Sequence, residues 1–196
     1  MNSTSPNLIR EKFNEIATLS DSGMEMLLGI AAPQTLNRGQ FLLKEGQVCR
    51  NFYFIETGQL RTFFNKEGKD INLNFSFESH FLTNLKSLLL LTPSAFNIQA
   101  SEKTLVWKFD RDKLFELYNA RCDIESFGRK LVEMLLIKQE EHSNLFKLYT
   151  PAERYHYVAK YHPKLLQRVS LSQLSSYLGI SRETVSRIRK KRSFAY

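Results

Sequence analysis

The stretch SLSQLSSYLGISRETVSRI, residues 170–188, contains the signals for two short helices separated by a tight turn. Ser170, followed three residues later by Gln173, is a capping box, which begins a helix. Gly179 suits the left-handed conformation that ends a helix, and Ser181 suits the N-cap of the next one. The sequence therefore predicts two capped helices that meet at Gly179.

The second of these helices has an apolar face and a polar face. Val185 and Ile188 are spaced by three residues and face inward. The outward face carries hydroxyl and charged groups, namely Arg182, Glu183, Thr184, Ser186, Arg187 and Arg189. Two short capped helices with a glycine turn and a basic second helix are typical of a helix-turn-helix that reads duplex DNA. The alternative is an ordinary helical hairpin.

Side-chain chemistry suggests a role for the outward residues. Arginine can donate two hydrogen bonds to guanine in the major groove, and glutamate can accept one from cytosine. We therefore expect Arg182 and Glu183, at the N-terminal end of the helix, to contact base edges, although Glu183 could instead pair with Arg187. The full predicted DNA-binding set, which includes expected phosphate contacts, is Ser170, Ser181, Arg182, Glu183, Thr184, Ser186, Arg187, Arg189 and Lys190.

The net charge of the chain is concentrated in the same region. Residues 150–196 hold ten basic and two acidic side chains, which account for the whole net charge of +8. Residues 1–149 are balanced, with 18 side chains of each sign. Such asymmetry predicts that the C-terminal part meets a polyanion. A basic tail that only keeps the protein soluble is the alternative.

A long helix is predicted at residues 121–149, before a small domain at 150–196 that begins with the start signal Thr150 to Glu153. Six of the seven residues 131–137 are apolar, a surface too wide for one partner. We expect the second partner to be the same helix of another subunit; burial inside one domain is the alternative. The predicted dimer interface is Phe127, Leu131, Met134, Leu135, Lys138 and His142.

Residues 1–120 form the remaining predicted domain. Helical spacing covers residues 7–30, with a capping box expected at Ser22 and Glu25. Between residues 35 and 107, apolar and aromatic runs are broken by glycines about every ten residues, which is typical of an antiparallel β-roll or barrel. The expected strands are residues 41–43, 52–55, 60–64, 71–77 and 97–109. The predicted fold class is α+β: an antiparallel β-roll, a long dimerisation helix and an all-α helix-turn-helix domain.

The sequence disfavours several classes of protein. No signal peptide is expected, and no apolar run approaches the roughly 20 residues that span a bilayer, so we expect a soluble, cytoplasmic protein. Cys49 and Cys122 form no CxxC pair, and no histidine stands at a metal-ligand spacing, so neither a metal nor a cofactor is predicted. An enzyme is the least supported class, because no phosphate-binding loop, dinucleotide fingerprint or nucleophile elbow is found.

Residues 180–188, ISRETVSRI, resemble the recognition helix of the CRP/FNR family, which contains the catabolite activator protein and the fumarate-nitrate regulator. Upstream segments are similar in the same order: LSD at 19–21, TLNRGQFLLKEG at 35–46 and YFIETGQLR at 53–61. The resemblance implies a bacterial transcription regulator with a cyclic-nucleotide-binding-like β-roll (a double-stranded β-helix), a dimerisation helix and a winged helix-turn-helix. It also implies RNA polymerase as a partner, and Arg182, Glu183 and Arg187 match base-reading positions.

The chain departs from the family pattern at the ligand cassette and at the wing. Nucleotide-binding members have a Gly-Glu pair and a later arginine, whereas this chain has FESH at 77–80 and PSAF at 93–96. Without a cation, a bound phosphate would remain unpaired, so we predict that cyclic AMP is not the effector. Glu78, Ser79 and Ser94 are weak effector-binding candidates. The chain ends at Tyr196, and the wing is expected to be truncated.

Three functional interpretations remain at this point. The first is a homodimeric, sequence-specific transcription regulator that responds to an effector other than cyclic AMP. The second is a small-molecule sensor with weak or partner-dependent DNA binding. The third is a regulator without an effector, in which the β-roll is only a dimer scaffold. The sequence leaves open the effector, the operator, the target genes and the sign of regulation.

Overall fold

The computed structural model describes the backbone of residues 5–193 and the side chains of residues 8–190. The chain divides into two compact units, residues 1–62 with 75–135 and residues 63–74 with 136–196. Helix α5 (Cys122–Leu148) contributes to both units. The compact units therefore divide the chain at other points than the predicted domains do.

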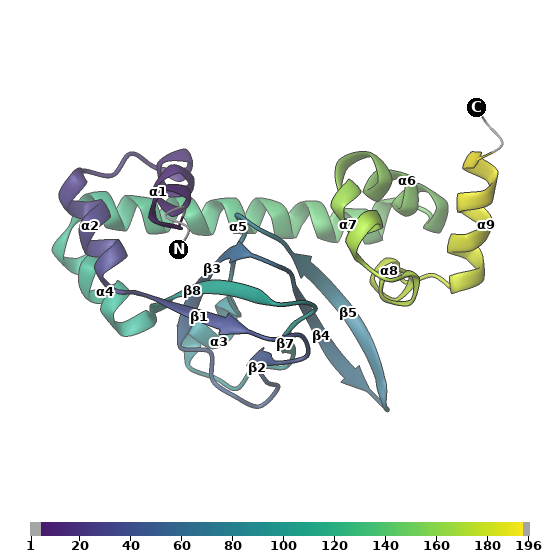
Figure 1. Cartoon of the computed structure of the whole chain (residues 1–196), viewed down its shortest axis with the longest axis horizontal. Coiled ribbons are helices and arrows are strands. Elements are labelled where there is room, and N and C mark those ends of the chain that lie inside the picture. The colour runs from purple at the N-terminus through teal and green to yellow at the C-terminus, as the bar shows by residue number, and fades with distance from the viewer. Residues whose placement is uncertain (1–4, 194–196) are drawn as a thin grey trace. The chain divides into compact units, whose positions relative to one another are not determined.

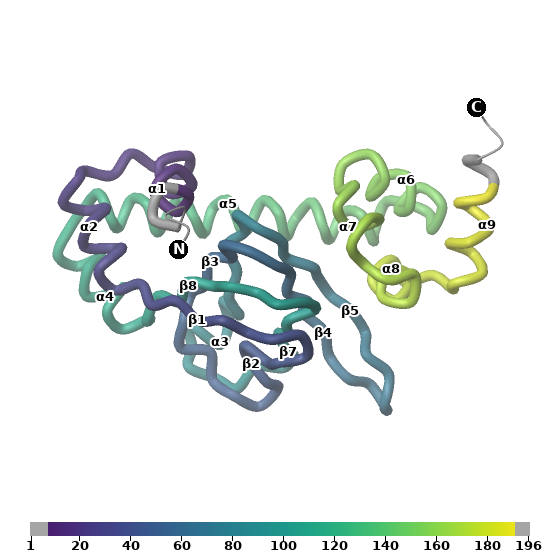
Figure 2. The backbone as a smooth tube through the Cα atoms, in the orientation of Figure 1, coloured from purple at the N-terminus to yellow at the C-terminus, as the bar shows by residue number. Residues whose placement is uncertain are grey.

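The β-roll consists of two four-stranded sheets (Figures 1 and 2). The strand order of the first sheet is β1 (Ala31–Leu36), β8 (Thr104–Asp110), β3 (Asn51–Thr57) and β6 (Phe81–Leu82). The strand order of the second is β2 (Phe41–Leu43), β7 (Asn97–Ala100), β4 (Leu60–Lys66) and β5 (Lys69–Ser76). Strand β3 pairs antiparallel with both β8 and β6. The predicted α+β class is confirmed.

Some elements differ from the sequence prediction. The expected strand 97–109 is two strands, because the chain turns between β7 and β8. Strand β6 and the short helix α3 (Leu85–Leu90) were not predicted. Both elements are short and begin within ten residues of the end of β5. The leucine run 88–91 shows neither the helical nor the strand spacing of apolar residues, so it did not indicate a helix.

Strand β3 is buried on both faces and joins two apolar cores. Phe52 and Phe54 pack with helical residues such as Phe13 of α1 (Ser5–Ile16). Tyr53 and Ile55 pack between the two sheets. The side chains alternate because successive residues of a strand point to opposite faces. The Phe13 ring centroid lies 4.8 Å from that of Phe127 on α5, so the first core reaches the long helix.

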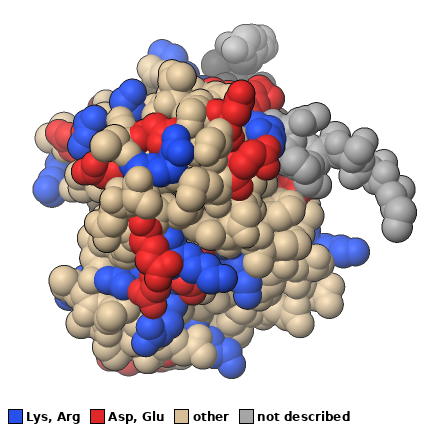
Figure 3. Space-filling model, turned by 90° about the vertical axis from the view of Figure 1, so that its left-hand side faces the viewer, with Lys and Arg blue, Asp and Glu red and all other residues tan. Residues whose placement is uncertain are grey.

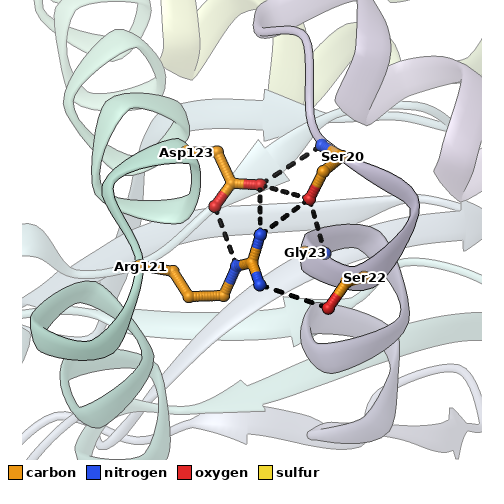
Figure 4. A network of polar contacts seen from close by, with 5 residues as sticks. All are labelled: Ser20, Ser22, Gly23, Arg121 and Asp123. Carbon is orange, nitrogen blue, oxygen red and sulfur yellow. Dashed lines mark hydrogen bonds and ion pairs between the residues drawn. The ribbon is translucent and has the colours of Figure 1, made fainter.

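Helix α2 (Asp21–Gly29) begins with a hydrogen-bond network that also holds the start of α5 (Figure 4). Ser20 Oγ accepts from Gly23 N at 3.0 Å and donates to Asp123 Oδ2 at 2.7 Å. Arg121 Nε donates to Asp123 Oδ1 at 2.9 Å, and Arg121 Nη1 donates to Ser22 Oγ at 3.2 Å. Hydrogen bonds from Arg121 and Ser20 hold the pKa of Asp123 well below its usual range. The predicted capping box at Ser22 is wrong, because Ser20 is the N-cap.

The second unit contains four helices after α5 in the part of the chain that is described. They are α6 (Pro151–Tyr161), α7 (Pro163–Arg168), α8 (Leu171–Leu178) and α9 (Arg182–Ser193). The predicted Thr150 to Glu153 signal is confirmed as a capping box. Pro163 ends α6 as expected, and it also begins α7, which was not predicted. The buried core residues of these helices and of the end of α5 are Leu145, Tyr155, Val158, Leu165, Val169, Leu174, Tyr177, Leu178 and Val185.

The tip of the β4–β5 hairpin belongs to this second unit. Ser176 Oγ of α8 donates to the Asp70 carbonyl oxygen at 3.1 Å and accepts from Asn72 N at 3.0 Å. In these two hydrogen bonds the Ser176 hydroxyl contacts main-chain atoms of the hairpin.

One face of the first unit shows no dominant charge. On the face in Figure 3, which lies at the end with α2 and α4 (Arg111–Ala120), basic and acidic side chains are interspersed. This agrees with the balanced charge of residues 1–149. Within the described residues, no helix combines the length and the apolar character needed to cross a membrane.

Candidate DNA-binding surface

The turn between α8 and α9 has the predicted caps. Ser170 Oγ accepts from Gln173 N at 3.2 Å, which confirms the capping box of α8. Gly179 has φ 66° and ψ 36°, so the left-handed conformation expected at the end of α8 is confirmed. Ser181 Oγ accepts from Thr184 N at 3.1 Å and caps α9. A residue with a Cβ atom would be strained at Gly179, which makes glycine the natural residue for this turn.

Helix α9 presents a polar outer face. Val185 is fully buried and Ile188 is partly buried, which confirms the predicted inner face. The exposed members of the predicted set are Ser170, Ser181, Arg182, Glu183, Arg187 and Lys190. The partly buried members are Thr184, Ser186 and Arg189. The structure thus brings the predicted residues together on α9 and at the start of α8.

Two arginines of α9 are held by hydroxyl groups of neighbouring helices. Arg182 Nη2 donates to Ser172 Oγ of α8. Arg189 Nε donates to the buried hydroxyl group of Tyr155 on α6 at 3.3 Å. Because a guanidinium has five N–H donors, the contact with Ser172 orients Arg182 and leaves other donors for a ligand.

Glu183 lies in the first turn of α9. Its pKa is lowered by its own backbone N–H group and by the Ser181 hydroxyl, with a smaller contribution from Arg182. A carboxylate is favourable at this end of a helix, where N–H groups are free. Among the ion pairs of the described residues none joins Glu183 to Arg187, so the alternative pairing one turn later is not supported.

Arg154 is basic but serves the interior of the second unit. Its guanidinium donates to the carbonyl oxygens of Tyr149 at 3.0 Å, Leu178 at 3.1 Å and Phe146 at 3.1 Å. It also lies 5.0 Å from the centroid of the Phe146 ring. These carbonyls end α5 and α8, so Arg154 ties both helices to α6. In the sequence analysis Arg154 was one of the ten basic residues expected to meet a polyanion. Its binding of carbonyl groups was not predicted, because these carbonyls come together only in the fold.

Two parts of the C-terminal prediction lie outside the described residues. The side chains of Lys191 and Arg192, at the end of the predicted basic tail, are not described. The expected truncation of the wing concerns the chain after Ser193, which is not described either.

Polar side chains of residues 83–96 in the β-roll are bonded to one another. Asn84 caps α3: its Oδ1 accepts from Ser87 N at 3.2 Å, and its Nδ2 donates to Ser94 Oγ at 2.8 Å. Ser94 Oγ in turn donates to the Phe96 carbonyl oxygen at 2.6 Å. Asn84, Ser87 and Ser94 are all buried. We call this set the Asn84 cluster.

The three effector-binding candidates do not form one site by their hydrogen bonds. Ser94 belongs to the Asn84 cluster, whereas Glu78 and Ser79 lie in the turn after β5. Glu78 Oε1 accepts from Gly58 N at 3.1 Å, and Ser79 N donates to the Ile55 carbonyl oxygen at 2.9 Å. Sequence reasoning missed Asn84, although an asparagine directly before an apolar run is an N-cap signal.

A family model described as "Cyclic nucleotide-binding domain" matches residues 33–121. This part of the chain is therefore similar to cyclic nucleotide-binding domains. The match spans the strands of both sheets from within β1 to β8, together with the Asn84 cluster. Comparison of the sequence with curated proteins finds no significant match.

Solved structures extend the likeness beyond this domain. The catabolite activator protein of Thermus thermophilus is 20% identical with a TM-score of 0.56, over 89% of this chain and 84% of that one. FixK2 of Bradyrhizobium japonicum is 20% identical with a TM-score of 0.66, over 83% of this chain and 84% of that one. CLP of Xanthomonas campestris, a c-di-GMP responsive global regulator, is 16% identical with a TM-score of 0.64, over 89% and 92%. The predicted resemblance to CRP/FNR regulators is thus confirmed in the fold.

The Asn84 cluster, within the residues that the family model matches, does not fit a cyclic phosphate. The core between the sheets is apolar, and Lys86, the basic residue within residues 81–100, is exposed. The buried polar groups of Asn84 and Ser94 are already bonded to each other. A phosphate placed there would have to break these hydrogen bonds and would meet no buried cation from residues 81–100, at a cost on the order of several kcal/mol.

The predicted dimer face of α5 packs within the chain. Phe127 and Leu131 are buried in the first core, and Met134 and Leu135 pack against it. His142 contacts Phe146 and Tyr177, and Lys138 is exposed. Phe127 and Leu131 are therefore covered by the chain itself, and a role of the other predicted residues between subunits stays a prediction. The exposed large apolar residues between 131 and 137 are Leu136 (56% exposed) and Ile137 (59% exposed).

Proposed function

We propose that the chain is a transcription regulator that binds duplex DNA sequence-specifically through α8 and α9. The observation that most directly supports this proposal is the exposed N-terminal end of α9, where Arg182 and Glu183 follow the Gly179 turn. A helix-turn-helix places this end of its second helix in the major groove. The fold shared with CRP/FNR regulators supports the same function. We propose no catalytic activity.

Within this proposal the polar residues divide by chemistry. Arg182, Glu183 and Arg187 would read base edges, because forked donors and a carboxylate can distinguish base pairs. The expected phosphate contacts, which fix position without reading sequence, are Ser170, Thr184, Ser186 and the basic tail Arg189 to Arg192. As in the family, RNA polymerase would be the protein partner and the cytoplasm the location.

We also propose that the regulator is a homodimer joined through the exposed side of α5. Exposed apolar residues on a long helix are typical of contacts between subunits. Ile137→Glu should give monomers by light scattering, because a charge would be buried in the interface. Gln139→Glu is the matched control, because Gln139 is also exposed and lies two positions further on, on roughly the opposite side of the helix. A dimer that is unchanged in the Ile137→Glu variant would contradict the proposal that this side of α5 joins the subunits.

The decisive experiment is selection of bound sequences from a random duplex library, followed by titration of the selected duplex across salt concentrations. An enriched, two-fold symmetric site with half-sites about one helical turn apart is expected. Binding that is only non-specific and steeply salt-dependent would contradict sequence-specific recognition by the protein alone.

A second candidate function, a small-molecule sensor, is favoured by Gln59. This residue is 1% exposed, and neither its side-chain nitrogen nor its oxygen has a hydrogen-bond partner among the described residues. A buried amide normally has partners, which can be an ordered water or a ligand. A polar metabolite that binds there should raise the melting temperature in a concentration-dependent way. A Gln59→Leu variant that keeps the full shift would assign the ligand to another site.

A further inference from the structure

His142 of α5 lies against the first helix of the helix-turn-helix, within the second unit. Its ring centroid is 5.5 Å from that of Tyr177 on α8 and 5.0 Å from that of Phe146 on α5. The Nε2 atom of His142 is buried and has no hydrogen-bond partner in the described chain. A neutral imidazole is tolerated in such a place, whereas a charged one would be buried without an acceptor.

The groups around His142 do not provide a counter-ion for the charged form. Burial, and secondarily the nearby His162, lower the pKa of His142. Burial raises the pKa of Tyr177 to about 12, so its hydroxyl is neutral. Glu141 on α5 acts on His162 and on Tyr157 of α6.

The remaining charged groups near this contact are already accounted for. Lys138 on α5 disfavours a proton on His162, whose pKa is lowered mainly by burial. On the hairpin, Asp70 lies next to α8, but its carboxylate accepts from Asn65 Nδ2 at 3.0 Å. A proton on His142 would therefore add a positive charge where aromatic rings and a neutral hydroxyl surround it.

We propose that His142 makes the DNA-binding unit sensitive to acid: its protonation loosens α8 from α5 and weakens the helix-turn-helix. The inference rests on the proposed function, because DNA binding is the output. Tyr177 connects His142 to the helix-turn-helix, because it contacts the His142 ring and lies on α8, the helix that precedes the turn to α9. Loss of the α5–α8 contact would leave α9 with its contact to Tyr155 on α6, but would free the helix on which its N-terminal turn is built.

The direction follows from proton linkage. An unfolded histidine has a pKa of about 6.5, and the folded value of His142 is lower. The stability contribution is therefore complete above about pH 6.5 and declines as the pH falls through that value toward the folded pKa. One proton changes the folding equilibrium by at most about tenfold per pH unit. Added positive charge alone would strengthen binding to DNA, so a loss of affinity in acid requires loosening of the structure.

The test compares wild type, His142→Phe and His156→Gln between pH 7.5 and 5.5. His142→Phe keeps the aromatic contact but cannot take up a proton, and His156 is an exposed histidine of α6 that serves as the matched control. Binding of the selected duplex should weaken in acid, by at most about tenfold per pH unit, for wild type and His156→Gln. His142→Phe should show no weakening. The same loss in His142→Phe, or no loss in wild type, would overturn the proposal.

Amide hydrogen exchange of α8 gives a second readout that needs no DNA. Faster exchange in acid, beyond the intrinsic pH effect measured on an unfolded peptide of the same sequence, is expected for wild type and not for His142→Phe. If wild type bound no duplex at any pH, the proposed function would fail while this measurement still tested His142. If His142→Phe did not fold, exchange of wild-type α8 that follows the intrinsic rate alone would overturn the proposal.

Discussion

The polar groups of the Asn84 cluster and those of α9 are used in opposite ways. In the cluster, Asn84 and Ser94 are buried and bonded to each other. On α9, Arg182 and Arg187 are exposed. Buried polar groups must find partners inside the fold, whereas exposed ones can meet a ligand. The comparison teaches that polar residues in the interior of the β-roll stabilise the fold, while the polar surface of the helix-turn-helix stays available.

The largest effect is expected from Arg154→Ala. This variant tests whether Arg154 stabilises the fold, like the buried polar groups, and does not serve to bind a ligand. The change removes three charge-assisted hydrogen bonds to carbonyl groups. We expect the free energy of unfolding to fall by about 3 kcal/mol, measured by denaturant titration. The matched control Arg182→Ala should stay within about 0.5 kcal/mol. Equal losses of unfolding free energy in the two variants would show that Arg154 stabilises the fold no more than the exposed Arg182 does.

Asn84→Ala tests the β-roll side of the comparison. Loss of the amide removes the side-chain acceptor of Ser87 N and one of the hydrogen bonds of Ser94 Oγ, which should lower the free energy of unfolding by about 2 kcal/mol. The exposed Lys86 provides the control, and Lys86→Ala should have little effect. Cyclic AMP should not raise the melting temperature of the wild type. A shift with cyclic AMP that Asn84→Ala abolishes would mean that the cluster is a ligand site after all.

Arg182→Ala tests the α9 side. The variant should lose about 1–3 kcal/mol of binding free energy for the selected duplex and accept other bases at one position. Repeated sequence selection with the variant measures both effects. A uniform loss across all duplexes, with the preference intact, would assign Arg182 to phosphate contact.

The smallest effect is expected from Lys190→Ala. A phosphate-contacting lysine contributes to all duplexes alike, so affinity should fall by less than about 1 kcal/mol without a change of preference. The slope of log K against log salt should decrease by about 0.9 for the lost contact. An unchanged slope would place Lys190 off the DNA.

Local signals in the sequence predicted local structure correctly. The capping boxes at Thr150 and Ser170 and the turn at Gly179 are confirmed, because the groups that form them lie within five residues of one another. The predicted strands within β2 to β5 are strands for the same reason: alternation and glycine turns are short-range patterns.

Predictions that depended on distant partners were less successful. Ser22 was expected to cap α2, but Ser20 does so with Asp123, about a hundred residues away in the sequence. The apolar period of α5 identified a face, yet the period does not reveal whether the chain or a second subunit covers it. Phe127 and Leu131 are covered by the chain itself.

By itself, the sequence determined the α+β class, the order of the elements, the caps and turn of the helix-turn-helix and the polar face of α9. Only the tertiary structure decided that Arg154 binds carbonyls, that Asn84 closes the polar segment of the β-roll and that His142 lies against Tyr177. The physical reason is one of range. Capping and periodicity arise from neighbours along the chain, whereas the burial and the partners of a polar group depend on which distant segments surround it.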